Sequence, residues 1–90
     1  MANAQDKFPL GNSPDPVVVL SSASLGALVR EQRKHLNLTQ ADLAGIGNTG
    51  NRFIVDLENG KPTIQLQKAL DLMELLGLEL VVRRKAGGLR

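Results

Sequence analysis

Residues 38–61 read LTQADLAGIGNTGNRFIVDLENGK, and this stretch combines two short amphipathic helices with a tight turn. Thr39 predicts the start of the first helix, because its hydroxyl caps free helical amides while Asp42 accepts from the cap backbone, a variant of the capping box. Asn48 predicts the end of that helix, since asparagine tolerates the left-handed conformation that a helix end requires. We therefore expect a helix and a turn before a second helix begins.

The second helix is expected to begin at Asn51, where apolar residues recur at helical spacing. Phe53, Ile54 and Leu57 predict the face that packs inward. Gly60, followed by Lys61 and Pro62, closes the helix. The residues left on or near the outside are Asn51, Arg52, Val55, Asp56 and Asn59. A unit of this kind presents its second helix to the major groove of DNA.

Two further helices flank this unit and predict a mainly α domain over residues 17–77. The first is expected to start at a Ser22 cap and to run to about Leu36, and it buries Leu25, Leu28, Val29 and Leu36. The last is expected to start at a Thr63 cap. Its apolar residues cover far more than a narrow stripe, which places it at the centre of the fold. They are Ile64, Leu66, Ala69, Leu70, Leu72, Met73, Leu75 and Leu76.

The two ends of the chain differ from the helical part. Residues 1–16 are polar and proline-containing, which predicts a flexible N-terminal arm, and the β-branched residues 17–20 predict a possible strand. Residues 78–85 alternate like a strand, with Leu78, Leu80 and Val82 on one face, and residues 86–90 form a tail. A lone strand needs a partner, either residues 17–20 or the same strand of a second subunit.

Length and composition favour one small domain that gains from dimerisation. A chain of 90 residues buries only ~60–65% of its unfolded surface, so it is marginally stable alone. It has no cysteine, which fits a reducing cytoplasm, and we expect neither a signal peptide nor a membrane-spanning segment. The formal charge is only +2, but basic residues cluster in the helical unit and near the C-terminal end.

Together, these residues resemble the lambda-repressor-like helix-turn-helix family, the Cro and xenobiotic-response-element type. The resemblance is ungapped from Arg33 to Lys61 and rests on Arg33, LTQ at 38–40, LA at 43–44, FI at 53–54 and LENGK at 57–61. It implies four helices and binding to double-stranded DNA. The chain departs from the family at the turn, where the usual Gly-Val-Ser is replaced by residues 48–50, Asn-Thr-Gly, and Gly50 lacks a capping side chain.

The resemblance implies a role for each matching position in DNA binding. Gln40, at the N-terminus of the first helix of the unit, is expected to contact a backbone phosphate, helped by free amides and the positive end of the helix dipole. Thr39 joins it, and Asn59 and Lys61 lie where relatives make further phosphate contacts. These contacts position a protein on DNA without specifying sequence. Arg33 and Glu58 match an internal ion pair that joins the first helix to the end of the third.

Four exposed residues of the third helix are expected to read base edges. Asn51 pairs with adenine and Arg52 with guanine. Val55 touches a thymine methyl, and Asp56 either accepts from cytosine or repels wrong registers. Arg52 and Asp56 also fit the simpler interpretation of solvated surface charges.

Residues 22–85 also resemble the HipB-like branch of antitoxins, through the helices, the LGLEL-VV segment and the basic end. The resemblance implies that the C-terminal strands of two subunits pair in a homodimer. It also implies a HipA-like serine/threonine kinase toxin as partner and repression of the protein's own operon at an inverted repeat. A free-standing dimeric regulator without a toxin is the alternative.

Other classes of function fit the chain poorly. An enzyme needs a nucleophile with a base, paired carboxylates or metal ligands, and one histidine, no cysteine and scattered acids supply none. An RNA or single-strand binder is expected to offer stacking aromatics, but the chain has two phenylalanines and no tyrosine or tryptophan. We therefore expect neither an enzyme nor a bound cofactor or metal.

Overall fold

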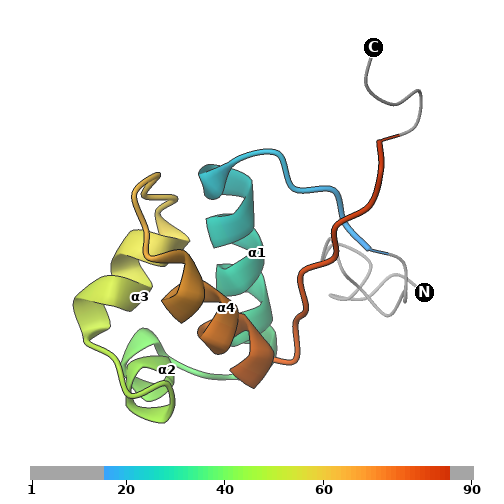
Figure 1. Ribbon diagram of the computed structural model, residues 1–90. Helices are drawn as coiled ribbons and strands as arrows, with labels where there is room; N and C mark the ends of the chain where they lie inside the picture. The colour runs from blue at the N-terminus through green and yellow to red at the C-terminus, as the bar shows by residue number, and fades with distance from the viewer. Residues whose placement is uncertain (1–15, 86–90) are drawn as a thin grey trace, which may run out of the picture.

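The computed structural model describes residues 16–85. In that range the chain forms four helices, and α3 contacts both α1 and α2 (Figure 1). The bounds of the helices are α1 Ser22–His35, α2 Gln40–Ile46, α3 Asn51–Glu58 and α4 Leu66–Leu75. The expected mainly α class and the four helices are confirmed for this part of the chain. The expected arm, apart from Pro16, and the tail at 86–90 lie outside the described residues.

The start of α1 differs by one residue from the expected position. Ser21, not Ser22, is the N-cap, because it forms a complete capping box with Ser24. The Ser24 amide donates to Ser21 Oγ at 3.0 Å, and the Ser21 amide donates to Ser24 Oγ at 3.3 Å. The helix ends at His35, and the expected burial of Leu36 is wrong, since Leu36 is the exposed C-cap.

All four helices end in the same hydrogen-bonded turn, the Schellman motif. In α3, for example, the Lys61 amide donates to the Asp56 carbonyl at 3.0 Å and the Gly60 amide donates to the Leu57 carbonyl at 3.1 Å. Each motif requires one residue with positive φ after the C-cap. These residues are Asn37 at 60°, Asn48 at 53°, Gly60 at 79° and Gly77 at 79°.

The start of α4 was predicted incorrectly. Pro62 and Thr63 form a turn, and the helix begins after Gln65, whose side chain makes no capping hydrogen bond. Of its apolar residues, Leu66 and Leu75 are exposed. A pattern with apolar residues on all sides predicts that a helix is central, but it does not predict which side remains exposed to solvent. The buried residues of this segment are Ala69, Leu72, Met73 and Leu76.

The core lies where these four helices meet. Val29 of α1, Leu43 of α2 and Ile54 of α3 are almost wholly inaccessible, as are the buried residues of α4. Phe53, Ile64 and Leu78 pack against this core while remaining partly exposed, and so do Leu25 and Leu38. The amphipathic face predicted for α3 is thus confirmed.

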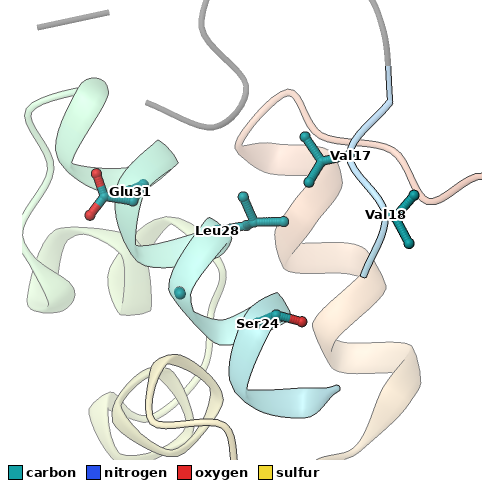
Figure 2. A pocket seen from close by; sticks show the side chains of 6 residues that line it. Val17, Val18, Ser24, Leu28 and Glu31 are labelled. Atoms are coloured by element: carbon teal, nitrogen blue, oxygen red, sulfur yellow. The ribbon is translucent and has the colours of Figure 1, made fainter. Parts of the chain in front are cut away.

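The segments on either side of the helices form no β-strand within residues 16–85. Residues 17–20 and residues 78–85 thus run without a β-ladder in the single chain, and the possible strand at 17–20 stays a prediction. Residues 17 and 18 instead pass along α1, where Val17, Val18 and Leu28 border an open pocket (Figure 2). Beyond Leu78 the chain leaves Leu80, Val81 and Val82 exposed.

Candidate nucleic-acid interface

The N-terminus of α2 is closed by the expected capping box. The Asp42 amide donates to Thr39 Oγ1 at 2.9 Å, and the Thr39 amide donates to Asp42 Oδ2 at 2.9 Å. The pairing fixes the entry of the chain into α2 and satisfies the amides of Thr39 and Asp42, whereas those of Gln40 and Ala41 have no acceptor within the helix. Thr39 is exposed and Gln40 half-buried, so this helix start borders solvent.

The pKa of the exposed Asp42 carboxyl is held below its ordinary value, first by the hydrogen bond from the Thr39 backbone and then by the Thr39 side chain. A lowered folded-state pKa means that the stabilisation by the capping box is complete above the unfolded-state pKa and is lost as pH falls through the folded-state pKa. We expect a carboxyl NMR titration to give Asp42 a lower midpoint in the folded protein than in an unfolded peptide. Equal midpoints would contradict this role of the capping box.

A buried network links α1 to the end of α3 and the start of α2. Arg33 Nε donates to Glu58 Oε2 at 2.6 Å and Arg33 Nη2 donates to Glu58 Oε1 at 3.0 Å, in a two-point pair. Both residues are less than a tenth exposed. The pairing raises the pKa of Arg33, against the opposing effect of burial. Arg33 Nη1 also donates to the Leu38 carbonyl at 2.7 Å, which anchors the loop before α2.

Gln40 belongs to this network. Its Nε2 donates to Glu58 Oε1 at 3.1 Å, so the carboxylate that neutralises Arg33 also orients the Gln40 amide. The family resemblance implied the two ends of the ion pair but not this third member. An amide nitrogen has two N–H groups, and the hydrogen bond to Glu58 uses one of them.

The expected base-reading residues lie at the start and along one side of α3. Asn51 and Arg52 are exposed, Val55 and Asp56 are half-buried, and Asn59 is exposed just beyond the helix. The departure from the family at the turn has a structural counterpart, since the N-cap Gly50 makes no side-chain hydrogen bond. Thr49 Oγ1 donates to the Gly50 carbonyl at 2.8 Å instead.

Asp56 lies between two cations. Its Oδ1 is 3.2 Å from Arg52 Nε, one turn earlier in α3, and its Oδ2 is 3.5 Å from Lys61 Nζ. The spacing of four residues between Arg52 and Asp56 signals the first contact in the sequence. The second depends on the turn at Gly60, which brings Lys61 back toward α3.

The other expected site residues lie away from α3. Leu78 packs against the core, whereas Leu80 and Val82 are exposed in the segment after α4. Within residues 16–85 the acidic residues and His35 form no group able to hold a metal ion. None of the helices in that range has the length and apolar character needed to cross a membrane.

The short helix α2, the turn after Asn48 and the partly exposed helix α3 define a helix-turn-helix protein. A helix-turn-helix family model matches residues 29–82. The chain belongs to this family, of the XRE type. It is 50% identical over 62 residues to the uncharacterized HTH-type transcriptional regulator y4mF of Sinorhizobium fredii, a match that covers 69% of this chain and 82% of the relative.

Proposed function

We propose that this protein is a sequence-specific repressor of transcription that binds double-stranded DNA through α3. Membership of the helix-turn-helix family and the similarity to an HTH-type transcriptional regulator support a DNA-binding regulator. The observation that carries the proposal is the exposed side of α3, whose end is joined to the N-terminus of α2 by the Gln40–Glu58 hydrogen bond. In this arrangement Asn51, Arg52, Val55 and Asp56 face base edges.

Phosphate contacts are proposed for Thr39, Gln40, Asn59 and Lys61. The capped start of α2 offers amides and a positive helix end, which attract a phosphate. Arg33 and Glu58 serve as the internal ion pair that holds α3 at the correct angle to α1. Such a division between positioning and reading groups is general in protein–DNA complexes.

Substitutions at Arg52 and Gln40 are expected to distinguish the contacts that recognise bases from the phosphate contacts that position the protein on DNA. Arg52→Ala should lose ~1–3 kcal/mol of binding free energy on the cognate site and relax the preference for guanine there. Gln40→Ala should weaken binding to all duplexes about equally. Fluorescence anisotropy on cognate and mutated operators, at several salt concentrations, measures both effects.

Arg52→Lys is the matched control, because it keeps the charge but loses the planar guanidinium that pairs with guanine at two points. It should retain binding to nonspecific duplex while losing the guanine preference. A full guanine preference in Arg52→Ala would contradict the reading role, and unchanged nonspecific affinity in Gln40→Ala would contradict its phosphate contact.

We also propose a homodimer in which the strands formed by residues 78–85 of two subunits pair. The support is the exposed apolar run of residues 80–82, with Val82 91% exposed, on a chain too small to bury much surface alone. The Leu80 and Val82 side chains share one face of such a strand, with Leu78 directed toward the core. The recognition helices would then reach successive major grooves ~34 Å apart on an inverted repeat.

Leu80→Asp is expected to weaken dimerisation by about tenfold or more, because a carboxylate would enter an apolar contact. Val81→Asp is the matched control, since residue 81 lies on the opposite face of the strand. Sedimentation equilibrium measures both variants. Equal dimerisation of both variants and the unmodified chain would contradict this interface.

The partner proposed for the dimer is a HipA-like serine/threonine kinase toxin, with the protein as its antitoxin and as repressor of their operon. The support is the resemblance of residues 22–85 to HipB-like antitoxins. Co-expression with a candidate kinase should yield a stable complex with suppressed kinase activity. Tight operator binding without such a complex would favour the free-standing dimeric regulator instead.

A further inference from the structure

Arg52, Asp56 and Lys61 form a small charged cluster on the outer side of α3, called here the Asp56 cluster. The Asp56 side chain is only 18% exposed, whereas that of Arg52 is 85% exposed. Both carboxylate oxygens of Asp56 are engaged, Oδ1 with Arg52 Nε and Oδ2 with Lys61 Nζ. A direct contact from Asp56 to a cytosine amino group would have to compete with these two cations.

The contact with Asp56 is made by Nε of Arg52. The two terminal nitrogens, Nη1 and Nη2, lie at the other end of the guanidinium group. Guanine offers two acceptors, O6 and N7, in the major groove, and an arginine binds both with a pair of N–H groups. A carboxylate bound at Nε therefore blocks none of the terminal N–H groups and restricts the directions that the long side chain samples. Because ordering a side chain costs free energy on binding, such a restraint lowers the cost of the guanine contact.

The same carboxylate carries a negative charge toward the DNA surface. It neutralises part of the charge of Arg52 and Lys61, which otherwise bind phosphates of any sequence. Exposed ion pairs contribute little to folding, ~0.3–0.5 kcal/mol for a pair four residues apart in a helix. The cluster thus stabilises the fold only slightly, and its larger effect falls on the difference between specific and nonspecific binding.

We infer that Asp56 is a positioning residue that orients Arg52 toward guanine and weakens the phosphate contact of Lys61 by competing for its ammonium group, so that it raises specificity at the cost of general affinity. This inference rests on the proposed binding of α3 to DNA. It replaces the expectation that Asp56 itself reads a base. The specificity of the protein then depends on Asp56 at the base pair that Arg52 contacts.

The test measures binding of the full chain and its Asp56→Asn variant to the selected operator and to operators with each base substituted, one position at a time. The substitution keeps the shape of the side chain and removes its charge. Guanine preference at the Arg52 position should fall about threefold to tenfold. Affinity for nonspecific duplex should rise. The slope of log affinity against log salt concentration should become steeper by about one, which corresponds to about one more phosphate contact.

Asp71→Asn is the matched control, because it removes a carboxylate from an exposed position of α4 that accepts a hydrogen bond from Gln67 Nε2, one turn earlier, at 2.9 Å. It should leave guanine preference unchanged. The double variant Arg52→Lys, Asp56→Asn should show no more loss of guanine preference than Arg52→Lys alone, because Asp56 acts through the arginine. Thermal unfolding of each variant shows that the comparison is between folded proteins.

Two results would overturn the inference. One is an unchanged guanine preference in Asp56→Asn. The other is a lost cytosine preference at a neighbouring base pair, with guanine unaffected, which would make Asp56 a direct reader. If the unmodified chain shows no base preference at all, the proposed function fails as well, so the two failures are distinguishable.

Discussion

Glu58→Ala is expected to lower the free energy of unfolding by ~3–5 kcal/mol, because it leaves the buried guanidinium of Arg33 without its counter-charge. Three hydrogen bonds are lost together, two from Arg33 and one from Gln40. Since small domains are stable by only ~5–15 kcal/mol, the variant should be close to unfolding at growth temperature. Urea unfolding monitored by circular dichroism measures the difference.

Glu74→Ala is the matched control, because Glu74 is exposed on α4, and its effect should stay within about 0.5 kcal/mol. The double variant Arg33→Met, Glu58→Leu should recover most of the stability, since apolar residues of similar volume often replace a buried ion pair without loss. It should still bind DNA more weakly, because Gln40 has lost the acceptor that orients it. A small effect of Glu58→Ala would contradict the role of the ion pair in holding α3.

Gly26→Ala is expected to destabilise the protein by about 1–3 kcal/mol through overpacking. Taken alone, the substitution of alanine for a glycine within a helix is expected to stabilise by about 1 kcal/mol. At this position, however, an added Cβ would lie 2.3 Å from the Leu57 carbonyl oxygen and 2.8 Å from that of Glu58. Both are backbone atoms of α3, so α1 and α3 would have to move apart.

Gly45→Ala provides the opposite expectation in the same protein. A Cβ at Gly45, in α2, meets no atom within 4 Å, so the substitution should stabilise by about 0.5–1 kcal/mol. Differential scanning calorimetry of both variants shows whether each substitution raises or lowers the stability of the protein. Stabilisation by both substitutions would show that α1 and α3 do not approach as closely as described. We also expect Gly26→Ala to weaken operator binding, since α3 is displaced.

Local patterns predicted the α2–turn–α3 unit well because its determinants are close in sequence. The Thr39–Asp42 capping box, the left-handed Asn48 and the Gly60 turn each depend on a few neighbouring residues. The resemblance to known regulators pointed to the pairing of Arg33 with Glu58, which lie far apart in the chain. Gln40 joined that pair only once the α2 start was placed beside the end of α3.

Features that depend on packing could not be predicted in the same way. The importance of Gly26 comes from the approach of two backbones, which no periodicity signals. The choice of buried residues in α4 depends on which side faces α1 and α3. The alternation over residues 78–85 is a strand pattern, but a single chain supplies no neighbouring strand for it among the described residues.

The proposed function is tested most directly by in vitro selection of bound duplexes from a random pool at physiological salt, with the purified full chain. We expect enrichment of an inverted repeat whose half-sites lie one helical turn, ~34 Å, or a multiple of it apart. The Arg52→Ala variant should lose the guanine preference in each half-site. Recovery of no shared sequence, or of the same sequence by the variant, would contradict DNA reading by α3.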